Sequence, residues 1–397
     1  MYRLPAWGLK FFAVVLVIVC IEFLSWMTLF FIGMHDASFA KIYDPVNNIA
    51  RYRGACENYL DTLEINPYLG FTHNQKCSND YYRVNNIGLL NQDVDASLIR
   101  KKYAIGIFGG SVASQFAGLN SISQLESLLN ACYTNKAEKL FAVYNFADGA
   151  WKQPQQVIAF SLYQDFLDAA ISVEGFNESY LIGWGVDMIY PPKNFYVLKE
   201  GVGFAAYSYR QIGAIQDTPL RFSSSIKALV LGFRLMATRL ENMRIQQEEV
   251  KYSKVVVDPN QHNDRRIRGF VRSFEGLGKA HDKYTLVVVQ PTPLGKVLTS
   301  REKMVVGKLD YGEKYQRVRH AIKSGAVNTL DLSDLFVNSN EEIFGDPIHF
   351  IKINGYKSLG DYYVALEIAK KLENDKVVFP RASLKNCLDS QRPDTLK

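Results

Sequence analysis

The sequence is poor in the residues that build metal sites. It has five cysteines and six histidines in 397 residues. No two cysteines have C-x-x-C spacing, and no cluster of histidines lies near them. Structural zinc sites usually depend on such spacing. We therefore expect neither a metal ion nor a cofactor in this protein.

A concentrated positive charge is also missing. The formal net charge is +6, and the longest basic cluster, residues 265–268, is short. A nucleic-acid-binding protein usually has a denser basic surface, so we expect no nucleic-acid partner. There is no internal repeat. A hydrophobic fraction of 48% and a charged fraction of 22% are ordinary for a globular protein of this size.

What the sequence does contain is one long apolar run near its start. Residues 11–34 carry a single charge, Glu22. A helix of this length can cross a hydrocarbon core of roughly 30 Å. Arg3 and Lys10 precede the run, which favours a cytoplasmic N-terminus. We expect a single-pass anchor in the inner (cell) membrane, with the rest of the chain periplasmic or extracellular. The alternative is a signal peptide cleaved near residues 38–40.

Glu22 itself has two interpretations. A carboxyl group within a membrane span can be tolerated in a protonated or snorkelling form. It can also mark a contact with a partner helix. The sequence does not choose between them.

Four cysteines lie outside the apolar run, and an even number is typical of an oxidising compartment. They are Cys56, Cys77, Cys132 and Cys387, whereas Cys20 lies within the run. A local bridge between Cys56 and Cys77 is plausible. The sequence does not fix the pairing of the four.

The remaining chain is predicted to form an α/β domain. Short apolar runs alternate with helical patterns, which indicates a mostly parallel sheet with helices on both faces. The expected strands are 103–108, 140–144, 169–173, 285–289 and 329–332. The predicted organisation is a cytoplasmic N-terminus (1–10), a transmembrane helix (11–34), a juxtamembrane lead-in (35–100), the main domain (101–380) and a polar, poorly ordered tail (381–397).

A long insertion, residues 179–282, interrupts the alternation of strands and helices. Part of it has apolar residues at helical spacing: Ile226, Leu229, Val230, Phe233, Leu240 and Met243. This helix either packs against the sheet or forms a lid over the carboxyl ends of the strands.

Chemically active residue types follow the predicted strands. Ser111 follows the first strand, residues 145–149 the second, residues 175–177 the third, and Asp346 with His349 the last. Ligands of open α/β sheets bind beyond the carboxyl ends of the strands. We therefore expect these four segments to converge on one edge of the sheet.

The convergent residues suit acyl transfer. Ser111 would be the nucleophile, His349 the base that accepts its proton, and Asp346 the group that orients His349. The backbone N–H groups of Ser111 and Gly149 and the side-chain amide of Asn177 would form an oxyanion hole. Taken singly, these residues have plainer explanations: Ser111 as a helix cap, Asp346 as a capping residue, and His349 as a surface histidine.

Together, these segments resemble the SGNH (GDSL-like) hydrolase superfamily. Gly109-Gly110-Ser111 resembles its Gly-Asp-Ser block, Gly149 its second block, residues 175–178 its Gly-x-Asn-Asp block, and residues 346–349 its Asp-x-x-His block. Gly110 replaces an Asp and Glu178 replaces the final Asp. The resemblance covers roughly residues 100–375. It implies a three-layer α/β/α sandwich, the flavodoxin-like SGNH hydrolase fold, and gives Ser111, His349, Asp346, Gly149 and Asn177 the roles above.

The expected function is that of a membrane-anchored serine esterase, acyl hydrolase or O-acyltransferase. Its substrate would be an ester-bearing glycan or lipid of the cell envelope, because some anchored relatives in this family modify envelope glycans. The alternative is a non-catalytic glycan-binding or assembly subunit that retains the fold. The acyl group, the acceptor and the oligomeric state stay open.

Overall fold

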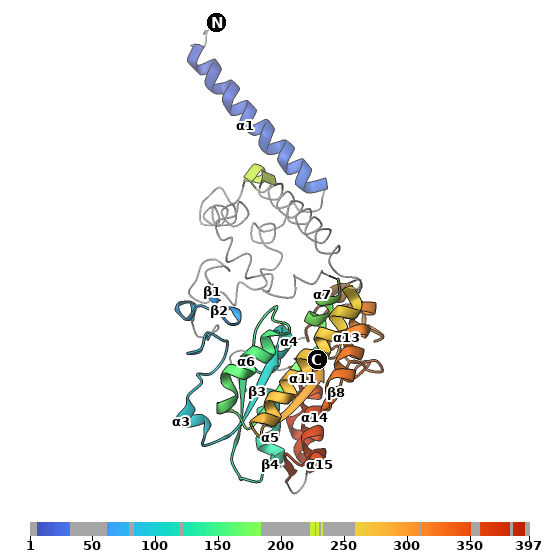
Figure 1. Cartoon of the computed structure of the whole chain (residues 1–397). Helices are drawn as coiled ribbons and strands as arrows, with labels where there is room; N and C mark the ends of the chain where they lie inside the picture. Colours follow the sequence, from blue (N-terminus) through green and yellow to red (C-terminus); the bar gives the residue numbers. More distant parts are fainter. Residues whose placement is uncertain are drawn as a thin grey trace. The chain divides into compact units, whose positions relative to one another are not determined.

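The structure is a computed structural model of the chain (Figure 1). It describes residues 6–31, 62–78, 83–118, 122–183, parts of 223–232, 259–350 except 308 and 310, 358–381 and 384–393. The chain forms two compact units. One comprises Met1–Arg53 with Lys199–Val250, and the other comprises Gly54–Leu198 with Lys251–Lys397.

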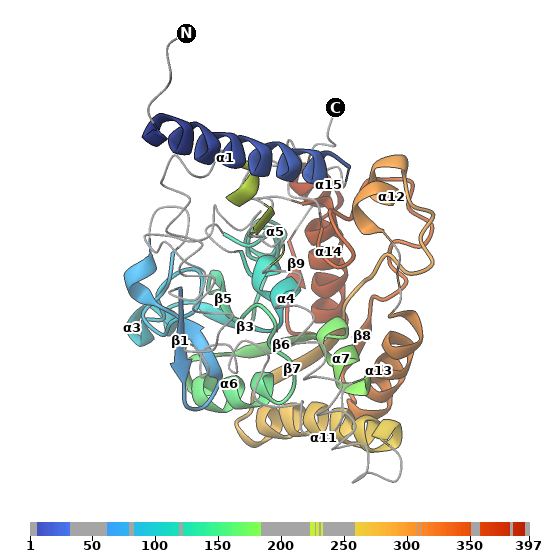
Figure 2. The same cartoon turned by 90° about the horizontal axis from the view of Figure 1, so that it is seen from above.

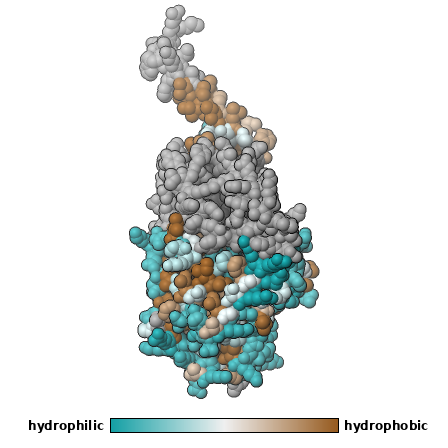
Figure 3. All heavy atoms as spheres, viewed as in Figure 1, coloured by the Kyte–Doolittle hydropathy of each residue, from teal (hydrophilic) through white to brown (hydrophobic). Residues whose placement is uncertain are grey.

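Helix α1 (Ala6–Phe31) is the main described element of the first unit. Within the described residues it is the one helix long and apolar enough to cross a membrane, over Val14–Phe31. Figure 3 shows its apolar surface in brown. This confirms a helix that can span a membrane within the predicted range 11–34.

Glu22 of α1 has partners from the insertion, within the same unit. Its carboxylate accepts hydrogen bonds from the Ser223 hydroxyl at 3.0 Å and from the backbone N–H groups of Ser224 and Ser225. The predicted insertion helix begins here. Its apolar positions Val230, Phe233, Leu240 and Met243 lie outside the described residues.

The second unit contains a five-stranded parallel sheet, as the sequence predicts. In spatial order its strands are β5 (Phe141–Ala147), β3 (Tyr103–Gly109), β6 (Ala169–Glu174), β7 (Tyr284–Val289) and β8 (Thr329–Asp331). In chain order this is 2-1-3-4-5, one of the common doubly wound arrangements. The order of the strands reverses between β3 and β6, and a crevice at such a point is where ligands bind.

Helices cover both faces of this sheet (Figure 2). Successive side chains of a strand point to opposite faces. Ile105 and Ile107 of β3 therefore join one core cluster, with α5 (Gln124–Cys132) and α14 (Leu359–Asn374). Ala104 and Phe108 join the other, with α6 (Gln155–Tyr163), α11 (Pro259–Ala280) and α13 (Gly312–Gly325). Burial on both faces explains why the strands read as unbroken apolar runs.

Part of the lead-in packs into this unit. Strands β1 (Leu63–Asn66) and β2 (Gly70–His73) form an antiparallel hairpin, followed by η3 (Gln75–Cys77) and α3 (Ala96–Ile99). Leu69 and Phe71 of the hairpin are buried in the core cluster that contains α6 and α11. The described part of the lead-in is therefore structurally continuous with the sheet domain.

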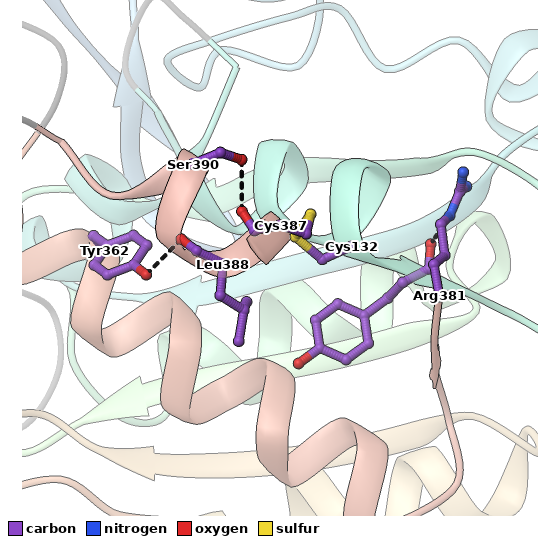
Figure 4. Close-up of a disulfide and its surroundings, with 7 residues drawn as sticks. Cys132, Tyr362, Arg381, Cys387, Leu388 and Ser390 are labelled. Carbon is purple, nitrogen blue, oxygen red and sulfur yellow. Dashed lines mark hydrogen bonds between the residues drawn. A yellow bond between two sulfur atoms is a disulfide. The ribbon is translucent and has the colours of Figure 1, made fainter. Parts of the chain in front are cut away.

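The C-terminal segment is more ordered than expected. Strand β9 (Phe379–Pro380) pairs with β4 (Tyr133–Thr134), and a helix, α15 (Leu384–Gln391), follows. A disulfide joins Cys387 of α15 to Cys132 at the end of α5 (Figure 4). The expectation of a poorly ordered tail is thus wrong for Leu384–Gln391. It relied on polar composition, which does not reveal a covalent tether.

The other cysteines are only partly described. Cys77 is disulfide-bonded. Its expected partner, Cys56, lies outside the described residues. Cys20 in α1 is a free thiol.

Candidate active site

Ser111 lies where β3 gives way to α4 (Ser111–Phe116), as the sequence predicts. Two glycines make the turn possible. Gly109 has a φ of +146°, and an added Cβ would lie 2.5 Å from the Val173 carbonyl oxygen. An added Cβ on Gly110 would lie 1.9 Å from the Asn177 amide nitrogen. The turn therefore brings Ser111 close to the start of the helix that carries Asn177.

Asp346 and His349 lie on a tight loop that is closed at its base. Phe344 and Phe350 form a β-bridge, and the Gly345 N–H donates to the His349 carbonyl oxygen at 2.8 Å. Within the loop, Asp346 Oδ1 accepts the N–H groups of Ile348 and His349, each at 2.7 Å. The aspartate thus also caps the loop, as its plainer interpretation predicts.

The structure connects Ser111, His349 and Asp346 by hydrogen bonds. His349 Nε2 lies 2.8 Å from Ser111 Oγ, and His349 Nδ1 lies 2.8 Å from Asp346 Oδ2. A neutral imidazole with its proton on Nδ1 donates to the carboxylate and accepts the serine hydroxyl proton at Nε2. This is the geometry that proton transfer from a serine nucleophile requires.

The electrostatics of Asp346 suit an orienting carboxylate. Burial by itself raises the pKa of this carboxyl group. The hydrogen bond and the charge of His349, together with two backbone N–H groups, outweigh burial and lower the pKa below its ordinary value. Asp346 therefore stays ionised at neutral pH and can stabilise an imidazolium at His349.

A buried ion pair fixes the chain just before the histidine loop. Glu302 Oε1 accepts the N–H groups of Ile343 at 2.9 Å and Phe344 at 3.1 Å. Glu302 Oε2 accepts from Lys296 Nζ at 2.6 Å, and both side chains are fully buried. Glu302 also closes a capping box with Thr299 at the start of α12 (Ser300–Val306). Sequence reasoning missed this pair, although the capping pattern Thr-x-x-Glu is a recognisable signal.

The three predicted oxyanion donors differ in the hydrogen bonds that they already make. Ser111 opens α4, where backbone N–H groups have no acceptor within the helix. Asn177 lies at the start of α7 (Phe176–Gly183), and its amide donates one N–H to the Trp151 carbonyl oxygen at 2.7 Å. Its second amide hydrogen remains for another acceptor. The Gly149 N–H donates to its neighbour, Asp148 Oδ1, at 2.6 Å.

Two buried acids that the sequence did not predict, Glu174 and Glu178, flank Asn177 in the chain. Glu178 accepts the Gly175 N–H at 2.7 Å and the Gln153 N–H at 3.3 Å. Glu174 accepts from Gln153 Nε2 at 2.6 Å. Burial, and then the charge of Glu178, raise the pKa of Glu174. This network ties the start of α7 to the chain just after Trp151.

Comparisons with known proteins do not assign the chain to a family. No protein-family model and no curated protein matches this chain. Among the residues that the structure describes, no three histidine, cysteine, aspartate or glutamate side chains are grouped so as to hold a metal ion.

Proposed function

We propose that the chain is a membrane-anchored serine acyl hydrolase or O-acyltransferase of SGNH type. One observation carries the proposal. The hydrogen-bonded series Ser111–His349–Asp346 has distances of 2.8 Å at both steps and lies at the carboxyl ends of the parallel strands. A capping serine and a surface histidine have no reason to meet across 238 residues of chain.

The proposed mechanism proceeds through an acyl-enzyme. Ser111 Oγ attacks the ester carbonyl carbon while His349 Nε2 takes the hydroxyl proton, and Asp346 stabilises the resulting imidazolium. The carbonyl oxygen becomes an oxyanion, which hydrogen-bond donors stabilise. His349 then returns the proton to the leaving alkoxide. Water or a sugar hydroxyl, deprotonated by His349, attacks the acyl-enzyme and frees Ser111.

The spatial arrangement supports the SGNH assignment. The family's Gly-Asp-Ser, Gly-x-Asn-Asp and Asp-x-x-His blocks resemble residues 109–111, 175–178 and 346–349. The structure brings these residues to one end of the sheet, around the point where strand order reverses. The 2-1-3-4-5 strand order agrees with the three-layer fold that this resemblance implies.

The proposed location is the outer side of the cell membrane. Helix α1 supplies an apolar span, and Arg3 and Lys10 favour a cytoplasmic N-terminus. The Cys132–Cys387 disulfide is typical of an oxidising compartment. The substrate would then be an ester-bearing glycan or lipid of the envelope, with release to water or transfer to an acceptor hydroxyl.

The test is active-site labelling of the full chain in detergent. A fluorophosphonate should label the wild type, while Ser111→Ala should abolish labelling and His349→Ala should slow it by at least about a thousandfold. Ser273→Ala is a matched control, because this exposed serine bonds within α11 to Gly269. Folded wild-type protein that resists labelling would refute the catalytic proposal and favour a non-catalytic role.

If the wild type is labelled, unlabelled protein from the same preparation would then be screened for its reaction. Nitrophenyl esters of short and long acyl chains distinguish an acetyl-sized site from a lipid-sized one. Adding a sugar acceptor separates the two reaction types, because a transferase would form an acylated sugar while a hydrolase would release only free acid.

A further inference from the structure

The β1–β2 hairpin packs against the segment that carries Gly149. Phe71 and Trp151 meet edge-to-face, with ring centroids 6.3 Å apart. Gln155 Nε2 donates to the Leu69 carbonyl oxygen at 2.5 Å. A second polar contact joins the two side chains of His73 and Asp148, with Nε2 2.8 Å from Oδ1. The hairpin therefore fixes the segment from residue 148 to 155 at several points.

The His73–Asp148 pair is buried next to Gly149, one of the proposed oxyanion donors. The two side chains are 9% and 4% exposed. Asp148 Oδ1 receives both the His73 ring nitrogen and the Gly149 N–H. The other carboxylate oxygen, Oδ2, is buried and has no hydrogen-bond partner among the described residues. Both donors that the described residues supply to this carboxylate therefore bond to the same oxygen.

This arrangement opposes the reaction proposed for the site. An oxyanion needs free N–H donors, and the Gly149 N–H is committed to a carboxylate. A substrate oxygen must displace that carboxylate from the Gly149 N–H. Until the carboxylate moves, Asp148 repels the negative charge that develops on the substrate oxygen. The resting geometry therefore keeps one predicted donor unavailable.

His73 is what makes this position of Asp148 stable. A buried carboxylate is costly unless hydrogen bonds compensate for its lost hydration. His73 supplies the second donor, and it is held firmly itself. The backbone N–H of His73 donates to the Gly88 carbonyl oxygen at 2.6 Å, and His73 pairs with Leu63 across the hairpin.

We propose that His73 and Asp148 are positioning residues that form a latch on the oxyanion hole. The latch is closed when Asp148 Oδ1 occupies the Gly149 N–H, and it opens when the carboxylate withdraws. The lead-in hairpin, through His73, sets the closed position. This inference rests on the proposed function, since it concerns the same oxyanion hole.

The test measures the second-order rate of fluorophosphonate labelling of the full chain in detergent. Asp148→Asn replaces the carboxylate by a neutral, weaker acceptor, so labelling should become roughly fivefold faster. With an ester substrate, the gain should appear in kcat rather than in KM. His73→Phe removes the donor while keeping a ring, and it should also accelerate labelling. His73→Gln keeps an N–H donor and should show a smaller acceleration than His73→Phe.

A matched control separates local from general charge effects. Asp165→Asn removes an exposed carboxylate in η4 (Gln164–Phe166) and should label at the wild-type rate. A folded Asp148→Asn protein that labels no faster than the wild type would overturn the latch. If Asp148→Asn does not fold, His73→Phe provides the same comparison. Failure of the wild type itself to label would instead overturn the proposed function.

Discussion

At the scale of single residues, a neighbouring side chain requires glycine at position 110, whereas the backbone conformation there does not. Its φ of −91° and ψ of −155° are open to any amino acid. A Cβ is excluded because it would lie 1.9 Å from the Asn177 amide nitrogen and 3.0 Å from the Trp151 carbonyl oxygen. The glycine at position 110 therefore lets the Asn177 amide approach the turn that carries Ser111.

Gly110→Ala should consequently impair catalysis, whereas Gly149→Ala should introduce no steric clash. The methyl group of Gly110→Ala would displace the Asn177 amide, and loss of one oxyanion donor costs roughly 100- to 1000-fold in kcat. At Gly149 an added Cβ meets nothing within 4 Å. Fluorophosphonate labelling rates of both variants give the comparison. Equal rates for Gly110→Ala and the wild type would exclude a role for Asn177.

At the scale of elements, two charged clusters hold the histidine loop and the sheet edge. Glu302 links the start of α12 to the chain at Ile343 and Phe344, just before Asp346. Asp331 ends β8 and binds Arg319 of α13, with Nε at 2.8 Å. Each cluster joins a loop to a helix, so its loss should lower the free energy of unfolding.

Glu302→Gln should lower the free energy of unfolding by about 3 kcal/mol, because it leaves the Lys296 ammonium buried without a counter-charge. The double variant Lys296→Met with Glu302→Gln should recover a substantial part of this loss. Urea denaturation followed by tryptophan fluorescence measures both. A single variant as stable as the wild type would show that the pair contributes nothing net.

The contribution of Asp331 should depend on pH. Burial would raise its pKa, but Ser333, Lys323 and Arg319 outweigh burial and lower the pKa from 3.8 to about 2. A lowered folded-state pKa stabilises the ionised form, so the contribution is complete above about pH 4 and is lost as the pH falls toward 2. The shift corresponds to about 2 kcal/mol.

Asp331→Asn should therefore reduce the free energy of unfolding by about 2 kcal/mol at pH 6 and by much less near pH 2.5. Urea titrations at the two pH values test this. Asp334→Asn, whose side chain is 59% exposed, is the control and should have a small effect at both. A deficit that did not shrink in acid would contradict the assigned cause.

At the scale of the whole molecule, a disulfide ties the C-terminal helix α15 to the rest of the second unit. The Cys132–Cys387 disulfide closes a loop of 255 residues that contains β5 to β8 and the histidine loop. Hydrogen bonds accompany it, with Tyr362 Oη donating to the Leu388 carbonyl oxygen at 3.0 Å (Figure 4). The tether therefore restricts the unfolded chain over most of this unit.

Replacing both cysteines by serine should lower the free energy of unfolding by roughly 3 to 5 kcal/mol, because long closed loops restrict the unfolded state most. Guanidinium unfolding without reductant measures the loss. Cys20→Ser is the control, since this thiol is free and lies in α1. The tether would be dispensable if the double serine variant unfolded at the wild-type midpoint.

The strands could be predicted from the sequence alone, and so could the three residues of the hydrogen-bonded series Ser111–His349–Asp346. Buried parallel strands must be apolar on both faces, so their runs were visible without long-range information. Chain direction then placed Ser111, Asn177 and the Asp346–His349 segment at one end of the sheet. The sequence also marked the apolar span within α1.

The contacts that surround this hydrogen-bonded series could not be predicted, because they form between segments far apart in the sequence. Nothing in the local sequence links His73 to Asp148, yet the two side chains meet across 75 residues. Glu302 reaches Ile343 across 41 residues. Such contacts depend on where loops cross in space, and local patterning carries no information about that. The same reason explains why Gly149 was predicted as a free donor, whereas its N–H is bonded to Asp148.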